Sequence, residues 1–205
     1  MGRPVRDPEP DTKERFDRRY YARYYESPRT RVTSRREVAR LGAFVFAYMA
    51  HLQLPVRRVL DAGCGLGYWR DALAEHHPRA SYRGIEVSEY LCRTKGWERA
   101  SIVDYAPRGQ FDLVVCQGVL QYLPNRQAAQ AIDNLAELCR GALYLEALTR
   151  GDWEQSCDRR ATDGDVHLRS AAWYRKRLAP HFHACGGGIF VHRDAPTVLY
   201  ELERG

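Results

Sequence analysis

The stretch Arg58-Val-Leu-Asp-Ala-Gly-Cys-Gly-Leu-Gly-Tyr68 decides how the chain folds. Val59 and Leu60 are apolar and suit a short buried strand that ends at Asp61. An amphipathic run begins at once after the glycines, so the order is strand, tight turn, helix. Glycines let the backbone turn sharply and let a ligand lie against it without a Cβ in the way. They occupy alternate positions: Gly63, Gly65 and Gly67.

The spacing of these glycines indicates which ligand the turn binds. In the dinucleotide fingerprint Gly-x-Gly-x-x-Gly, Tyr68 would replace the third glycine. The observed Asp-x-Gly-x-Gly-x-Gly resembles the first motif of class I S-adenosylmethionine-dependent methyltransferases. The resemblance implies S-adenosylmethionine as cofactor and S-adenosylhomocysteine as product; a turn that binds no ligand is the alternative. The residues it assigns to the cofactor here are Asp61, Gly63, Cys64, Gly65 and Gly67.

A second acidic residue lies in register with the first motif. Glu86 ends the expected strand at residues 82–86, 19 residues after Gly67, which is the length of one helix and one return strand. A carboxylate at that point can accept ribose hydroxyls, as in dinucleotide folds. The resemblance extends this site to Val87, to Gln117 after the fourth strand, and to an acid near the adenine after a third strand at residues 100–103. That acid and its neighbour are Asp104 and Tyr105.

The remaining strands predict an α/β fold. Within Phe111–Cys116 the residues after Asp112 are continuously apolar, as in a central strand buried on both faces, and a fifth strand is expected at 142–148 after a helix that Gly141 ends. Helices alternate with these strands, which indicates a parallel sheet. Extended segments at 189–192 and 197–202 follow three consecutive glycines. The resemblance, over residues 34–203, implies a Rossmann-like three-layer sandwich: a mostly parallel seven-stranded sheet with a C-terminal antiparallel hairpin and N-terminal helices as a lid.

We divide the chain into an N-terminal part, residues 1–33, and a cofactor-binding domain, residues 34–205. Residues 1–12 are predicted to be a mobile tail. The domain begins with a helix capped by Ser34, with Glu37 completing a capping box. Between the tail and this helix, aromatic residues recur at helical spacing. The spacing suits either a helix docked on the core or a lid over the active site. These aromatic residues are Phe16, Tyr20, Tyr21, Tyr24 and Tyr25.

The acceptor site is expected at the carboxyl edge of the sheet, where open α/β folds bind ligands. The long polar stretch 149–169 follows the fifth strand there. His167 is the candidate general base, since it lies in this stretch, and Tyr122 and Gln117 are candidates for orienting the acceptor. The family often has His where Gln121 and Tyr122 stand, so no general base is expected from the loop after the fourth strand. Further candidates for acceptor contacts are Tyr21, Tyr25, Arg31 and Trp153.

Composition restricts the alternatives. The chain has 205 residues and a net charge of +6. Residues 1–58 carry 14 Lys and Arg against 7 Asp and Glu, and the remainder carries 18 against 19. The basic segment fits a solvated helical face, an anionic substrate or nucleic acid. Six widely spaced cysteines predict reduced thiols and no metal site. The sequence shows no signal peptide and no apolar run long enough to span a bilayer, so a cytoplasmic protein is expected. We expect it to be a monomer or a homodimer.

These observations predict a methyltransferase that moves a methyl group to a small-molecule O or N acceptor by in-line displacement. A nucleic-acid methyltransferase is an alternative, but the Asp/Asn-Pro-Pro-aromatic motif of such enzymes is replaced by Cys116-Gln-Gly-Val119. A non-catalytic S-adenosylmethionine-binding regulator is another, because binding and turnover are separate properties. Tyr68 argues against a nicotinamide-dependent oxidoreductase. Neither a nucleic-acid nor a membrane partner is expected.

Overall fold

The computed structural model describes residues 15–204. Within this range seven strands form one mixed sheet in the order β3-β2-β1-β4-β5-β7-β6. The first five run parallel, β7 runs antiparallel to β5, and β6 runs antiparallel to β7. The strands are β1 Arg58–Ala62, β2 Ser81–Glu86, β3 Glu98–Arg99, β4 Phe111–Gln117, β5 Cys139–Glu146, β6 Phe182–Ala184 and β7 Ile189–His192. The predicted tail at 1–12 lies outside the described residues.

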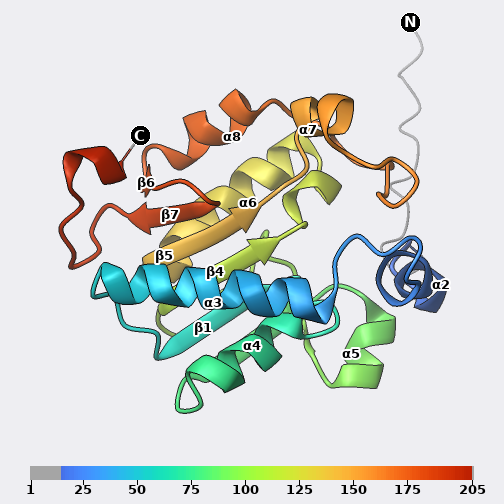
Figure 1. The fold of residues 1–205 in the computed structure, drawn as a ribbon, viewed down its shortest axis with the longest axis horizontal. Helices are drawn as coiled ribbons and strands as arrows, with labels where there is room; N and C mark the ends of the chain where they lie inside the picture. The colour runs from blue at the N-terminus through green and yellow to red at the C-terminus, as the bar shows by residue number, and fades with distance from the viewer. Residues whose placement is uncertain (1–14, 205) are drawn as a thin grey trace, which may run out of the picture.

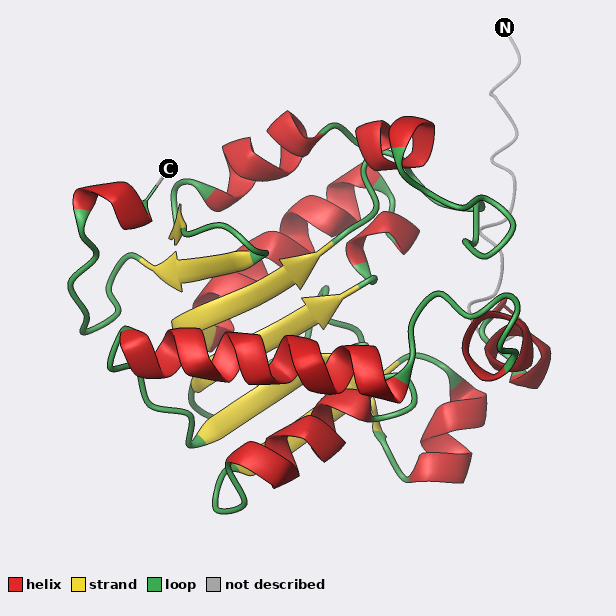
Figure 2. Ribbon diagram, in the orientation of Figure 1, coloured by secondary structure: helices red, strands yellow, loops and turns green. Residues whose placement is uncertain are grey.

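Helices cover both faces of the sheet (Figure 1). The α-helices are α2 Arg18–Tyr21, α3 Arg35–His51, α4 Tyr68–His76, α5 Glu89–Lys95, α6 Asn125–Leu138, α7 Arg150–Gln155 and α8 Ala171–Leu178. A π-helix, η1 Ala22–Glu26, continues α2, and two short 3-10 helices are η2 Leu120–Tyr122 and η3 Glu201–Glu203. Figure 2 shows the strands enclosed between these helices. Among residues 15–204, no helix combines the length and the apolar character that crossing a membrane requires.

Alternation along β4 divides the core into two halves. Leu113 and Val115 pack on one face, with α3 and α4, while Val114 and Cys116 pack on the other, with α6 and α8. All four side chains are fully buried. The continuous apolar run is therefore explained by burial on both faces, and the predicted three-layer Rossmann-like sandwich is confirmed.

The start of α3 agrees with the sequence, although its cap differs in detail. The Ser34 hydroxyl oxygen accepts from the Glu37 backbone N–H at 3.3 Å. The Glu37 carboxylate, however, accepts from the Ser34 hydroxyl at 2.6 Å, where a full capping box would bond the Ser34 backbone N–H.

Three predicted strand boundaries are wrong. The third strand is the two-residue β3, which ends at Arg99, so residues 100–105 form a turn instead of a strand. The fifth strand begins at Cys139 and runs through Gly141, where a Cβ would lie 2.3 Å from the Asp112 carbonyl oxygen. That glycine allows close strand contact and does not end a helix. Residues 197–202 pair with no strand among the described residues, and Leu202 is fully exposed.

Candidate functional site

The glycine turn follows β1 and is tied to β2. The backbone N–H groups of Gly63 and Cys64 both donate to the Ile85 carbonyl, at 2.9 and 3.1 Å. All three glycines have positive φ: +76° at Gly63, +50° at Gly65 and +83° at Gly67. A Cβ on Gly63 would lie 2.4 Å from Val119, and one on Gly67 would lie 2.8 Å from Trp97. Packing therefore requires the outer two glycines.

Gly65 differs from its neighbours because open space faces it. The atom nearest to a Cβ at this position is the Gly63 carbonyl oxygen at 4.0 Å. Its own carbonyl accepts from the Trp97 indole N–H at 2.9 Å, which fixes the peptide orientation. The middle of the turn is thus a rigid backbone surface that a ligand can approach.

Glu86, at the end of β2, holds the turn in place. Its Oε2 accepts from the Gly65 N–H at 3.0 Å, and its Oε1 accepts from the N–H groups of Val87 and Ser88 at 2.8 and 2.9 Å. Burial raises the pKa of this carboxyl, while the three N–H donors act in the opposite direction. A carboxylate has about four acceptor sites, so Oε2 can accept one further donor.

Asp61 is a second buried carboxyl beside the same turn. The Tyr82 hydroxyl donates to its Oδ2 at 2.6 Å, and the residue is only 2% exposed. Burial raises the pKa of Asp61 to about 7, the Tyr82 hydrogen bond opposes that rise, and the charge of Glu86 adds to it. A cation placed beside Asp61 would favour the ionised form.

Two cavities meet at the glycine turn. The β2-side cavity, about 320 Å³, contains Glu86 and Val87. The β5-side cavity, about 500 Å³, contains Asp61 and Glu146. The residues that line both are Tyr20, Tyr25, Gly63, Gly65, Gln117, Gly118 and Tyr122. The two cavities therefore form one continuous site at the carboxyl edge of the sheet.

Most of the residues predicted to bind a cofactor line this site, and three do not. Gly67 packs on Trp97, outside both cavities. Asp104 is exposed, and with Tyr105 it lines a separate surface pocket; the Tyr105 hydroxyl contacts Arg83 and Glu98. Because β3 ends early, the turn brings different residues to the β2-side cavity: Ala100, Ser101 and Ile102.

The N-terminal segment of residues 15–26, here called the lid segment, covers the site. The carbonyl of Phe16 accepts from the Ser88 hydroxyl at 2.6 Å, and the hydroxyls of Tyr20 and Tyr122 lie 2.7 Å apart. Arg15 pairs with Asp163 at 3.4 Å and stacks on the Tyr122 ring at 4.8 Å. Figure 1 shows α2 at the edge where the parallel strands end. The aromatic stripe thus packs on the core and also lines the cavities.

The segment between β5 and α8 closes the other side. This polar stretch contains α7, whose Thr149 and Asp152 form a full capping box. The His167 N–H donates to the Gln121 carbonyl at 2.8 Å. Buried Arg169 donates to the Leu120 carbonyl at 2.9 Å and also to the Leu123 carbonyl. These bonds attach the segment to η2.

The remaining predicted acceptor residues lie at different places. Tyr21 lines the β2-side cavity, as does the exposed His167. Trp153 packs against Gly164 and under the Arg159 guanidinium, and lines neither cavity. Arg31 is exposed and lines neither.

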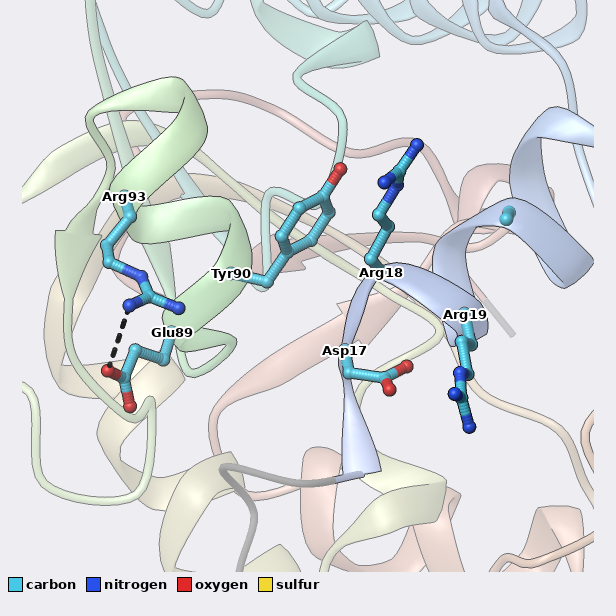
Figure 3. A pocket seen from close by; sticks show the side chains of 7 residues that line it. Asp17, Arg18, Arg19, Glu89, Tyr90 and Arg93 are labelled. Carbon is cyan, nitrogen blue, oxygen red and sulfur yellow. Dashed lines mark ion pairs between the residues drawn. The ribbon is translucent and has the colours of Figure 1, made fainter.

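Other arginines of the basic N-terminal segment line an outer pocket. This pocket, about 570 Å³, is formed by Arg18 and Arg19 of α2 and by Glu89, Tyr90 and Arg93 of α5 (Figure 3). Arg93 pairs with Glu89 at 3.8 Å, and Asp17 adds a second carboxylate. These arginines therefore do not face a ligand in the two cavities.

Sequence reasoning missed several lining residues. The Trp69 indole donates to Gln117 Oε1 at 2.8 Å, and Gln117 Nε2 donates to Glu146 Oε2 at 3.2 Å. Glu146 ends β5, so its position at the carboxyl edge was a usable signal. No comparable signal marks Gln121 in the sequence, because its place at the cavity depends on the path of η2. Among residues 15–204, no group of three or more His, Cys, Asp or Glu side chains is placed to hold a metal ion.

Comparisons with known proteins agree with this geometry. Residues 60–141 match the family model described as a methyltransferase domain. A trans-aconitate 2-methyltransferase from Azoarcus sp. is 29% identical over 146 residues, 60% of this chain and 56% of that protein. A ubiquinone biosynthesis O-methyltransferase from Methylococcus capsulatus is 30% identical over 115 residues, 49% of this chain and 47% of that protein. The chain spans about half the length of these curated relatives.

Solved structures show the same fold. The sugar N-methyltransferase KedS8 from Streptoalloteichus sp. superposes with a TM-score of 0.58 at 18% identity, covering 74% of this chain and 85% of that one. The matched stretch 60–141 includes the end of β1, the glycine turn, Glu86 and all of β4, which form the side of the two cavities that lies on the sheet. Residues 60–141 thus match a methyltransferase domain, and the fold of the described residues is that of the class I S-adenosylmethionine-dependent methyltransferases.

Proposed function

We propose that the protein transfers a methyl group from S-adenosylmethionine to an O or N atom of a small molecule. The observation that carries the proposal is the glycine turn: its open face at Gly65 is held by Glu86 at the point where two cavities meet. The names of two similar proteins give small molecules as acceptors: trans-aconitate for one and a sugar for the other. A nucleic-acid acceptor has no matching feature, since no Lys, Arg or His is among the described residues that line the β5-side cavity.

The residues present fit this cofactor. The β2-side cavity offers Glu86 for a ribose hydroxyl and apolar Val87, Ile102 and Leu123 for a purine ring. Gly65 leaves room for the chain that joins the ribose to the amino acid, and Asp61 suits the ammonium group. When bound, S-adenosylmethionine supplies a methyl carbon that bonds to the acceptor lone pair as the carbon–sulfur electron pair returns to sulfur. The protein then has to hold the acceptor in line and exclude water.

The identity of a general base remains a prediction. His167 lines the β2-side cavity, and the β5-side cavity that we assign to the acceptor contains carboxylates instead. Tyr122 lines both cavities, and burial raises the pKa of its hydroxyl, which favours a role in orienting the acceptor over proton removal. Turnover by H167A tests the base assignment: loss of turnover with intact cofactor affinity would support it.

Methyl transfer is tested with S-adenosylmethionine carrying an isotopic label in the methyl group. The protein is incubated with pools of small alcohols, phenols, amines and carboxylates, and labelled products are identified by mass spectrometry. We expect stoichiometric release of S-adenosylhomocysteine with one class of acceptor. Binding of the cofactor without transfer to any pool would favour the regulatory alternative.

Asp61 is expected to make cofactor binding depend on pH. Its pKa of about 7 means that the free protein holds this carboxyl partly protonated below neutral pH, whereas the ammonium of the cofactor prefers the ionised form. Binding therefore releases a proton, and affinity rises with pH. Between about pH 6 and pH 7, where the ammonium of the ligand keeps its proton, we expect a gain of roughly fivefold for S-adenosylhomocysteine by calorimetry. D61N, which keeps an acceptor for Tyr82, is expected to show a flat profile; an equally steep profile would contradict the assignment.

The lid segment is expected to limit release of the cofactor. Y20F removes the hydroxyl contact with Tyr122 and should increase the dissociation rate of S-adenosylhomocysteine several-fold, about 1 kcal/mol for one neutral hydrogen bond. Stopped-flow fluorescence measures the rate. R23A is the matched control, since Arg23 is exposed on the same segment and stacks only on Tyr24. Equal dissociation rates in Y20F and the wild type would mean that the lid segment is a static part of the cavity wall and does not limit release.

A further inference from the structure

The β5-side cavity contains a polar atom that lacks a partner. Gln121 is 8% exposed and lines this cavity, and its Oε1 is the buried side-chain atom without a hydrogen-bond partner among the described residues. An unpaired buried acceptor is unfavourable in the free protein unless a ligand donates to it. A half-turn of the terminal amide would bring this oxygen to the cavity, where a bound molecule that carries a hydrogen-bond donor would satisfy it.

Every charged side chain among the described residues that line this cavity is acidic. Apart from Asp61 beside the glycine turn, Glu146, Asp152 and Asp163 line the cavity, and no Lys, Arg or His is among the described residues that do so. Glu146 forms no ion pair among residues 15–204; it accepts from the Tyr144 hydroxyl at 3.0 Å and from Gln117. Asp163 is paired with Arg15, which approaches from the β2-side cavity. A carboxylate ligand would meet repulsion from Glu146, because the adjacent cation, Arg15, is already paired with Asp163.

Aromatic rings complete the wall. Tyr25 and Tyr68 line the same cavity, and the faces of such rings attract cations. Carboxylates, an unpaired acceptor and aromatic faces together suit a group that is positively charged and rich in N–H donors. They do not suit a carboxylic acid.

We propose that the β5-side cavity selects an amine-bearing acceptor, held by Gln121 and Glu146, and excludes carboxylates. This inference rests on the proposed function and names the acceptor class for it. It assigns specificity to Gln121 and Glu146, two residues outside the glycine turn. The sulfonium of S-adenosylmethionine is itself a cation, so Asp61 and Trp69, beside the turn, are assigned to the cofactor.

The test uses matched pairs of probes that differ in charge: benzylamine against benzoate, and glucosamine against glucuronate. Each is titrated into protein saturated with S-adenosylhomocysteine, whose sulfur is neutral, with ligand-observed NMR as the readout. We expect each amine to bind at least about tenfold more tightly than its carboxylate partner. Tighter or equal binding of the carboxylates, or no binding of either member, would overturn the inference. Failure of S-adenosylhomocysteine to bind would instead contradict the proposed function.

Two variants assign the effect to the cavity. E146Q and Q121L are expected to weaken benzylamine binding about tenfold while S-adenosylhomocysteine affinity stays unchanged. Q121L should also raise the melting temperature of the free protein, because it removes the unpaired atom. A residue with a purely structural role would not combine higher stability with weaker binding. D158N is the control, since Asp158 is exposed, pairs with Arg160 and lines neither cavity. Unchanged amine affinity in both E146Q and Q121L would refute the assignment.

Discussion

Replacing Gly65 with alanine is expected to abolish most cofactor binding while the protein remains folded. The new Cβ meets no protein atom closer than 4.0 Å, so it points into the space where the two cavities join. A bound cofactor would have to move away from it. Overpacking of this kind costs about 1–3 kcal/mol, which corresponds to roughly tenfold to hundredfold weaker binding. Calorimetry with S-adenosylhomocysteine measures the change.

Gly96 provides a matched control for this substitution. It also has a positive φ, +72°, and also has open space around its Cβ position, but it ends α5 and lines neither cavity. G96A and G65A should therefore lose similar stability, about 1 kcal/mol each, from the backbone conformation alone. Only G65A should lose affinity. If the two variants bind S-adenosylhomocysteine equally well, the turn does not contact the cofactor.

Replacing Glu86 with glutamine is expected to weaken both the fold and cofactor binding. The carboxylate accepts three backbone N–H bonds, and one end of a glutamine amide is an NH2 group that cannot accept them. We expect a loss of about 1–3 kcal/mol in unfolding free energy and roughly tenfold to hundredfold weaker binding. E98Q is the control, because Glu98 lies on neighbouring β3, is exposed and lines neither cavity.

Deoxy analogues separate the two roles of Glu86. If the free acceptor site on Oε2 receives a ribose hydroxyl, the wild type should bind the 2′-deoxy or the 3′-deoxy analogue of S-adenosylhomocysteine about tenfold more weakly. E86Q should show no further loss with that analogue. A wild type that binds both analogues as well as the parent compound would restrict Glu86 to holding the turn.

The fold could be predicted where one strong local signal determined it. The run Phe111–Cys116 and the glycines after Asp61 fixed the central strands and the turn between them, because burial on both faces and positive φ values restrict the residue types. Boundaries failed where tertiary contact decided the conformation. Gly141 looks like a helix stop in the sequence but lies inside β5, since the Asp112 carbonyl approaches it closely.

The site could be predicted only in part. Asp61 and Glu86 line the cavities as expected, because strand ends of a parallel sheet meet at one edge. Asp104 was misplaced when β3 proved to be two residues long, and Trp153 was misplaced because it packs on Gly164 within its own loop. Gln121 and the pairing of Arg15 with Asp163 depend on the paths of η2 and the lid segment, which no local pattern encodes.

Calorimetric titration of the purified protein with S-adenosylmethionine and S-adenosylhomocysteine is the most direct test of the central claim. The geometry at Gly65, Glu86 and Asp61 predicts binding of both at one site per chain, with affinity in the micromolar range, about −8 kcal/mol. G65A should bind both ligands roughly tenfold to hundredfold more weakly under the same conditions, and G96A should bind both as tightly as the wild type does. Absence of heat with either ligand in the wild type would contradict the account, because the glycine turn would then have only a structural role.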